Sequence, residues 1–282
     1  MSEPVAQAAP AESVPVSESA PLAESVSFIF FGDAGTGDPD QFAVANAVSQ
    51  WCGAHPCGFV ALLGDNFYPA GVRSVRDPQW VRKFEEPYGA LNLPFRPALG
   101  NHDYYGHEGA QLRYHSARWS MPARYYTYRE GLAEFFVIDT ERYNRREQVW
   151  LEKALAASDA PWKVVYGHHP IRSSGKHGDT PELRSKLEPL LEAAGVAFYL
   201  CGHDHDLEII DAEGSTPMVI AGGGGAGLRT LTPVSGSVYA ESMLGFGYMT
   251  IEAESATVRM IGTDGSVRFE RTWPLPVAGP AR

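Results

Sequence analysis

The chain has 282 residues, of which 44% are hydrophobic and 20% charged, and its net charge is −11. This length and composition are typical of a globular protein with one large domain or two small ones. The negative charge argues against a surface that binds nucleic acid or an anionic membrane, and no apolar run reaches the roughly 18 residues needed to span a bilayer. A phosphate-bearing ligand would therefore need a local positive field.

The first part of the chain has a composition unlike the rest. Residues 1–27 contain neither Lys nor Arg and are rich in Ala, Pro, Ser, Val and Glu. They predict a disordered leader, followed by a single domain over residues 28–282. The leader lacks the basic and apolar regions of a signal peptide. It is either an extension or the tail left after removal of such a peptide, and we expect a periplasmic or secreted protein.

The three cysteines are too few for a disulfide scaffold and wrongly spaced for structural zinc. Cys201 falls in an apolar run and is expected to be a small buried side chain. Cys52 and Cys57 span a loop. They form a disulfide, as an oxidising compartment would permit, or remain free thiols.

The chain up to residue 205 alternates apolar runs with helical patterns. Strands are expected at 27–31, 58–63, 95–99, 134–139, 162–166 and 196–201. Helices are expected from Pro39 to about Trp51, from Pro78, over 145–157 and from Pro181. Residues 104–128 show no clear period and predict an irregular excursion near the site. The pattern indicates an α/β fold with helices on the faces of its sheet.

After residue 205 the helical pattern stops. Strands are expected near 217–220, 248–253, 257–263 and 267–273, which indicates a β-rich closure. Four glycines at 222–225 follow one of these strands. We expect them to form a loop that borders a ligand site.

Five predicted strands end in glycine followed by polar residues. Each ending alone has an ordinary explanation, such as a cap or a buried histidine. Five endings at the same edge of one sheet indicate instead a ligand site. The candidates are Asp33, Asp65 with Tyr68, Asn101 with His102, His168 with His169, and His203 with His205.

This set combines carboxylate, amide, phenol and imidazole groups and contains no thiolate. Its composition excludes a zinc knot and suits two oxygen-preferring metals about 3.5–4 Å apart. Such a pair is a template for phosphoryl displacement.

At these residues the chain resembles a known family. The blocks GDAG (32–35), GDNFY (64–68), GNHD (100–103), GHHP (167–170) and GHDH (202–205) resemble, in order, the five signature blocks of the calcineurin-like metallophosphoesterases. Tyr68 narrows the resemblance to the purple acid phosphatases, and to their small tartrate-resistant type. The resemblance covers residues 28–210 and extends more diffusely to 273. It implies a four-layer α-β-β-α sandwich and an acid phosphatase that hydrolyses phosphate monoesters by attack of a metal-bound hydroxide.

The resemblance also implies roles for single residues. Asp33, Tyr68 and His205 would hold Fe(III), while Asn101, His168 and His203 would hold a divalent Fe, Zn or Mn ion, and Asp65 would bridge the two. A tyrosine commonly follows the first histidine of the fourth block, so His169 is an alternative to His168, which position favours. His102 and His177 match the histidines beside the leaving group. Small phosphate esters would be substrates, and phosphate-like oxyanions inhibitors.

Two other functions remain open at this point. A phosphodiesterase or nucleotide pyrophosphatase would use the same metals, although the resemblance links Tyr68 to monoesterases. A non-catalytic phosphate-binding module would keep the fold without turnover. The complete set of candidate ligands argues against the second of these alternatives.

Overall fold

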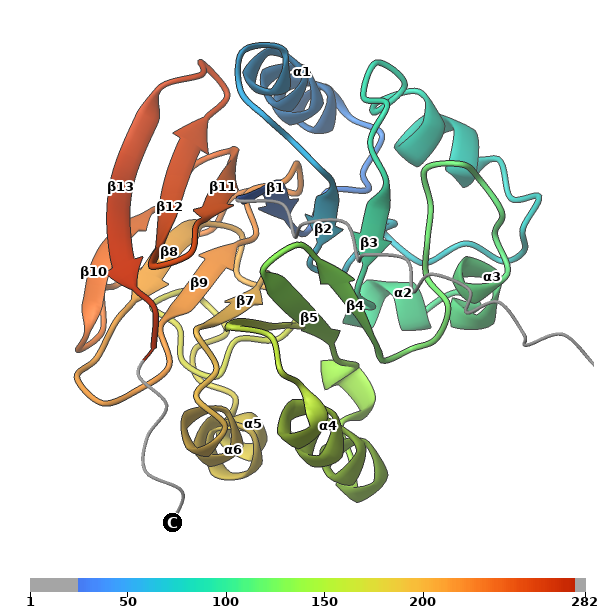
Figure 1. Ribbon diagram of the computed structural model, residues 1–282. Coiled ribbons are helices and arrows are strands. Elements are labelled where there is room, and N and C mark those ends of the chain that lie inside the picture. Colours follow the sequence, from blue (N-terminus) through green and yellow to red (C-terminus); the bar gives the residue numbers. More distant parts are fainter. Residues whose placement is uncertain (1–24, 277–282) are drawn as a thin grey trace, which may run out of the picture.

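The computed structural model describes residues 25–276 and places thirteen strands in two sheets (Figure 1). The first sheet contains, in spatial order, β13 (Val267–Pro274), β12 (Ser255–Gly262), β11 (Gly245–Ile251), β1 (Val26–Phe31), β2 (Val60–Leu62) and β3 (Phe95–Pro97). The second contains β10 (Ser237–Glu241), β8 (Leu207–Ile210), β9 (Met218–Ala221), β7 (Phe198–Cys201), β6 (Trp162–Tyr166), β5 (Ala133–Val137) and β4 (Tyr126–Glu130). The expected leader lies outside the described residues, apart from residues 25–27.

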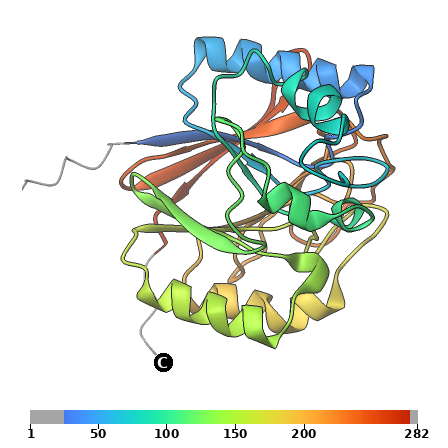
Figure 2. The same ribbon diagram turned by 90° about the vertical axis from the view of Figure 1, so that its right-hand side faces the viewer.

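Helices cover the outer face of each sheet, which gives a sandwich of four layers (Figure 2). The longest helix, α1, lies against the first sheet, whereas α4, α5 and α6 lie against the second. The helices are α1 (Pro39–Ala54), α2 (Asn101–Tyr104), α3 (Glu108–Leu112), α4 (Arg145–Ala157), α5 (Pro181–Lys186) and α6 (Glu188–Ala193), with a π-helical turn at Val81–Glu85 and a 3-10 turn at Thr140–Arg142. The α-β-β-α sandwich is therefore confirmed.

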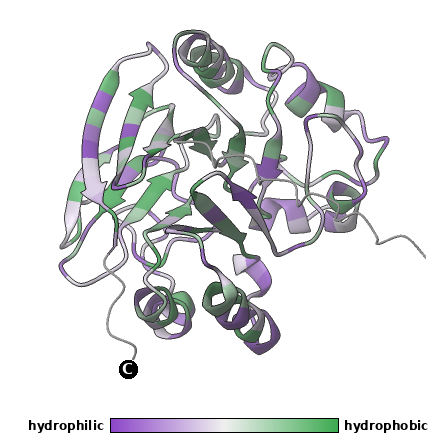
Figure 3. Cartoon of the chain, viewed as in Figure 1, coloured by the Kyte–Doolittle hydropathy of each residue, from purple (hydrophilic) through white to green (hydrophobic). Residues whose placement is uncertain are grey.

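Two apolar cores hold the layers together. Between the sheets, Phe28 of β1 stacks on Phe59 at 4.8 Å and meets the edge of Phe135 of β5 at 5.1 Å. The next residue of β5, Phe136, faces the opposite way and joins the core beneath α4 to α6. Neighbouring strand residues point to opposite faces, so a central strand buried on both sides reads as a continuous apolar run. Figure 3 shows hydrophobic residues concentrated in such strands.

The neighbouring strands that carry the polar endings run parallel. β1 pairs with β2 and β2 with β3, while β6 pairs with β7. The carboxyl ends of the strands in each group therefore lie at one edge. The expectation of a single sheet edge was wrong, because these strands belong to two sheets that face each other.

Several elements differ from their predictions. Residues 104–128 are less irregular than expected, since they include α3 and the start of β4. The helix expected from Pro181 is split into α5 and α6 near Pro189. Strand β1 begins at Val26, inside the expected leader. Short strands such as β8 and β10 carry too few residues to show a period.

One pair of cysteines forms a disulfide, and the third cysteine is a buried free thiol. Cys52, in the last turn of α1, is bonded to Cys57, and the two Cα atoms are 5.6 Å apart. Cys201 is free and fully buried in β7. Within residues 25–276, no helix has both the length and the apolar character needed to cross a membrane.

Candidate metal centre

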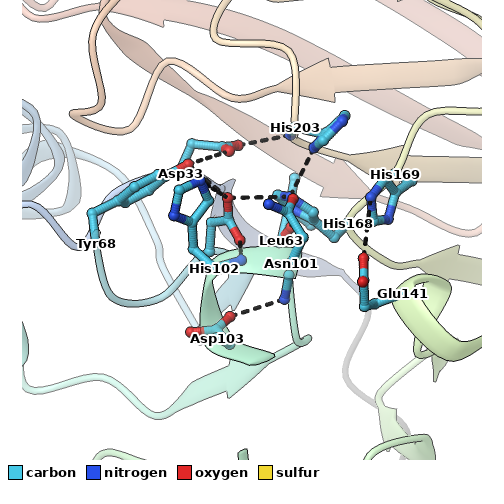
Figure 4. Close-up of polar contacts among 12 residues, drawn as sticks. Asp33, Leu63, Tyr68, Asn101, His102, Asp103, Glu141, His168, His169 and His203 are labelled. Atoms are coloured by element: carbon cyan, nitrogen blue, oxygen red, sulfur yellow. Dashed lines mark hydrogen bonds and ion pairs between the residues drawn. The ribbon is translucent and has the colours of Figure 1, made fainter. Parts of the chain in front are cut away.

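The polar strand endings of both sheets meet in one cluster (Figure 4). Asp33, Asp65 and Asn101 follow β1, β2 and β3 of the first sheet, whereas His168 and His203 follow β6 and β7 of the second. Asp33, Asp65 and His168 each offer a ligand atom, and these atoms lie within 4.8 Å of one another. All three residues are buried, whereas Tyr68, Asn101 and His203 are half-buried.

The backbone is unusual at the cluster. Among the described residues other than glycine, only Asp33, Asp65 and His203 have positive φ angles, which are 59°, 51° and 72°. This left-handed conformation costs a non-glycine residue about 1–3 kcal/mol and is concentrated at functional sites. Next to Asp65, Gly64 has a φ of 89°, and a Cβ atom there would lie 2.7 Å from the Cβ atom of His168. The site therefore depends on a close approach of the two sheets.

One half of the cluster surrounds the Tyr68 hydroxyl group. Its oxygen lies 2.9 Å from Asp33 Oδ1, 2.7 Å from Asp65 Oδ2 and 3.2 Å from His205 Nε2. The Nδ1 atom of His205 faces the Gly227 carbonyl oxygen at 2.7 Å and must donate to it, so Nε2 of the neutral ring is an acceptor. One phenolic hydrogen cannot serve three acceptors. This half of the cluster has the donor deficit that a bound cation removes.

The other half surrounds His168. Its Nδ1 atom lies 2.9 Å from the Leu63 carbonyl oxygen and donates to it, which leaves Nε2 as an acceptor in the neutral ring. Nε2 faces Asn101 Oδ1 at 3.2 Å, His203 Nδ1 at 3.2 Å and Asp65 Oδ2 at 3.4 Å. Here too, lone pairs converge on one point. A carbonyl that fixes the histidine tautomer in this way is typical of metal-ligating histidines.

The charges of the site are strongly coupled. Although burial opposes it, the negative charges of Asp65 and Asp33 raise the pKa of His168 to about 10, so that without a cation Nε2 holds a proton in the place that a metal would take. Burial would raise the pKa of Asp65, but the nearby His168 holds it well below the usual range. Burial, followed by the charges of Asp33 and Asp65, raises the pKa of Tyr68 far above its ordinary value. A tyrosinate at this position therefore requires a highly charged cation.

The two candidate histidines that are not ligands lie beside the cluster. His102 Nδ1 is 2.7 Å from the Pro69 carbonyl oxygen, and its Nε2 is 4.0 Å from Asp65 Oδ2. The ring centre of His177 lies 4.3 Å from that of His203. Each therefore flanks one side of the ligand set.

His169 lies outside the cluster of ligand atoms. Its Nδ1 is 2.9 Å from Thr140 Oγ1 and its Nε2 is 3.6 Å from Glu141 Oε2. Burial and the charge of His168 lower the pKa of His169 to about 3. Of the two histidines in the fourth block, the structure brings only His168 into contact with Asp65 and Asn101.

Other residues that hold the site in place were not predicted. Asp103, which is fully buried, accepts hydrogen bonds from Gly100 N at 2.9 Å, Asn66 N at 3.1 Å and Gln111 Nε2 at 2.8 Å. It thereby ties the loop after β2 to the loop after β3. Thr140 Oγ1 accepts from His168 N at 3.2 Å. Asp103 lies in the GNHD block, but its long-range partners left no signal in the sequence.

Comparisons with known proteins agree with this geometry. A family model described as calcineurin-like phosphoesterase matches residues 26–207. Tartrate-resistant acid phosphatase type 5 of Oryctolagus cuniculus is 32% identical over 268 residues, covering 80% of this chain and 81% of that protein. Purple acid phosphatase 3 of Arabidopsis thaliana is also 32% identical, over 277 residues, covering 85% of this chain and 75% of that protein.

Solved structures show the same fold at lower identity. Purple acid phosphatase PPD1 from yellow lupin superposes with a TM-score of 0.74 at 19% identity, over 88% of this chain and 53% of that one. GAP50, described as the anchor in the inner membrane complex of Plasmodium, superposes with a TM-score of 0.81 at 24% identity, over 90% of both chains. The arrangement of layers is thus shared by a phosphatase and by an anchor protein.

Proposed function

Since this chain belongs to the calcineurin-like phosphoesterases and, among them, to the purple acid phosphatases, we propose that it hydrolyses phosphate monoesters as an acid phosphatase. The fold alone does not carry this proposal, because GAP50 has a similar fold and is described as an anchor. The observation that carries it is the convergence of lone pairs around Tyr68 and His168.

The donor set fits two metal ions. Fe(III) would be held by Asp33, Tyr68 and His205, because phenolate and carboxylate are hard, anionic ligands. A divalent Fe, Zn or Mn ion would be held by Asn101, His168 and His203, in keeping with its amide and imidazole donors. Asp65 reaches both Tyr68 and His168 and would bridge the two ions. When bound, the metals would activate water for attack on phosphorus and neutralise charge on the phosphoryl oxygens.

The ligands also account for a phosphate site in an acidic protein. Asp33, Asp65 and a Tyr68 phenolate carry about −3 against about +5 from the two metals, so the occupied site would be locally positive. That field has the sign opposite to the net charge of −11. Small phosphate esters would be recruited by it, and phosphate-like oxyanions would compete for the same place.

His102 is the residue best placed to act on the leaving group. Its Nδ1 is held by the Pro69 carbonyl oxygen, so Nε2 is the atom that is free to move a proton. The ring centre lies 4.3 Å from that of Tyr68, at the edge of the ligand set. His177 lies on another side, against His203.

The test compares two esters on the metal-loaded protein. p-Nitrophenyl phosphate should be hydrolysed with a kcat/KM at least 100 times that of bis(p-nitrophenyl) phosphate. The reverse preference would identify a phosphodiesterase, and turnover of neither ester would identify a non-catalytic module. Metal analysis of the purified protein should find iron together with a second metal.

We also propose that the protein works in an oxidising compartment, either the periplasm or outside the cell. The Cys52–Cys57 disulfide supports this location, because such bonds persist where thiols are not kept reduced. Thiol counting in the denatured protein, isolated without reductant, should find one free thiol from three cysteines.

A further inference from the structure

Arg229 lies beside the candidate catalytic site on a loop that is firmly held. In this loop, Ala226 N donates to Asp33 O at 2.8 Å and Gly227 O accepts from His205 Nδ1 at 2.7 Å. The Arg229 carbonyl oxygen accepts from Ser242 Oγ at 2.6 Å. The loop is thus tied to two of the candidate metal ligands, and the position of Arg229 is coupled to the metal centre.

The guanidinium group points toward the histidine side of the site. Its Nη1 atom donates to the His203 carbonyl oxygen at 3.1 Å and contacts Nε2 of His177. The His177 ring in turn lies against the His203 ring, with centres 4.3 Å apart. Arg229 therefore contacts the backbone of the candidate ligand His203 without reaching the ligand atoms themselves. It lies next to His177, which matches a histidine beside the leaving group.

The positive charge of Arg229 is not paired with a carboxylate. Among residues 25–276, no Asp or Glu oxygen lies within 4.0 Å of its guanidinium nitrogens, although eleven other arginines have such a partner. Within the same range, Nη2 and Nε of Arg229 make no hydrogen bond. The exposed Lys176, next to His177, likewise has no carboxylate partner there. Two free cations flank His177 in a protein with a net charge of −11.

We propose that Arg229 is a specificity-determining residue that binds a second anionic group, carried by the leaving group of the substrate. The inference rests on the proposed phosphatase function. A guanidinium group with free donors fits a carboxylate or phosphate through paired hydrogen bonds, and its place beyond His177 puts it past the reacting phosphate. Substrates of this kind are phosphate esters of alcohols that carry a carboxylate or a further phosphate, as opposed to esters of uncharged alcohols.

The first test measures binding without turnover. Isothermal titration of the metal-loaded protein compares 3-phosphonopropionate, which carries a carboxylate, with propylphosphonate, which does not. The carboxylated ligand should bind about tenfold more tightly, and Arg229→Gln should reduce the ratio to near one. Arg229→Lys should retain part of the preference, because lysine keeps the positive charge but cannot make the paired hydrogen bonds of a guanidinium group. An unchanged ratio in Arg229→Gln, or an equal loss for both ligands, would overturn the proposal.

The second test measures turnover of a matched pair, 3-phosphoglycerate and glycerol 3-phosphate. In Arg229→Gln, KM for 3-phosphoglycerate should rise about tenfold with kcat little changed, since uniform binding is lost. KM for glycerol 3-phosphate should stay the same. The matched control is Arg145→Gln, whose side chain is 72% exposed on α4 and paired with Glu152; it should change neither ester.

The two tests separate failure of this inference from failure of the proposed function. If the wild-type protein hydrolyses no ester but prefers the carboxylated phosphonate until Arg229 is replaced, the phosphatase function is wrong and the anion site stands. If both esters are hydrolysed and neither ligand pair shows a preference, the phosphatase function stands and the role of Arg229 is wrong.

Discussion

The Oδ2 atom of Asp65 lies 2.7 Å from the Tyr68 hydroxyl oxygen and also 3.4 Å from Nε2 of His168. The first contact belongs to the half of the site that would hold Fe(III), and the second to the half that would hold the divalent ion. Asp65 is the carboxylate through which the two halves meet.

Asp65→Asn should lower the occupancy of both metals and reduce kcat/KM by at least 100-fold. The amide has no charge and offers a single oxygen, so it is a poor bridge between two cations. Metal content per chain, measured by mass spectrometry, and p-nitrophenyl phosphate turnover check this. Asp159→Asn, at a side chain that is 86% exposed, is the control. Loss of one metal with full retention of the other would contradict the bridging role.

His168→Ala and His169→Ala should have different effects on metal content. His168 faces Asp65 and Asn101, so its loss should empty mainly the divalent site. His169 contacts Thr140 and Glu141, so its replacement should leave occupancy intact and alter packing or substrate contacts. Metal analysis of both variants shows which of the two histidines is the metal ligand. If His169→Ala alone drained the site, the role given to His168 would be wrong.

Tyr68→Phe should bleach the protein. A phenolate bound to Fe(III) absorbs visible light through charge transfer, so the iron-loaded wild-type protein should be pink to violet. The variant keeps Asp33 and His205 and should retain part of its iron without the visible band. A spectrum recorded beside an iron assay tests this. A colourless, iron-free and fully active wild-type protein would refute the assignment of Tyr68.

His102→Ala should impair hydrolysis of glycerol phosphate far more than that of p-nitrophenyl phosphate. Protonation of the leaving oxygen matters most for a strongly basic alkoxide and least for nitrophenolate. The difference in loss should be about tenfold or more in kcat. Since His177 also matches a histidine beside the leaving group, the His177→Ala variant and the His102→Ala/His177→Ala double variant belong in the series. Equal losses for both esters in all three variants would leave leaving-group stabilisation to the metals.

Glu147 makes stability depend on pH at a position away from the metal ligands. Burial raises its pKa to about 8, and its Oε1 atom accepts a hydrogen bond from Asp139 N at 2.7 Å. The folded state therefore holds a proton that the unfolded state releases near pH 4.5, so stability should fall as pH rises between about 4.5 and 8. Glu147→Gln should reduce the loss in free energy of unfolding between pH 5 and pH 8 by a few kcal/mol at most. Urea unfolding at pH 5 and pH 8 measures the difference. An equally steep decline in the variant would show that Glu147 does not cause it.

The resemblance predicted the α-β-β-α fold class, and a local sequence pattern marked the candidate ligands. The candidate ligands could be named because each of their five blocks begins with a glycine that follows an apolar run, which is a local pattern. What the pattern could not show is that Asp65 and His168 come from different sheets. Long-range pairing of strands leaves no periodic signal in a single chain. Strands such as β8, with four residues, are also too short to show a period.

The same limit explains the residues that were missed. Asp103 reaches Asn66 and Gln111 across loops, and Thr140 reaches His168 over 28 positions. Arg229 lies 52 positions from His177. Their contacts exist only after the two sheets have packed. By contrast, α4 was predicted with its bounds at Arg145 and Ala157, because its apolar period is local; the structure adds a cap at its start, where Asn144 accepts from Arg146 N and Glu147 N.

The division of the ligands between two sheets has a consequence for resistance to unfolding. Metal ions bound by Asp33 and Asp65 from one sheet and by His168 and His203 from the other would act as cross-links between layers that are otherwise joined mainly by side-chain packing. A ligand that binds only the folded chain adds about 4 kcal/mol when its concentration exceeds Kd by a factor of about 1,000. The stability of the folded protein would then depend on the concentration of metal around it. A shortage of iron would shorten the lifetime of the folded chain as well as abolish its activity.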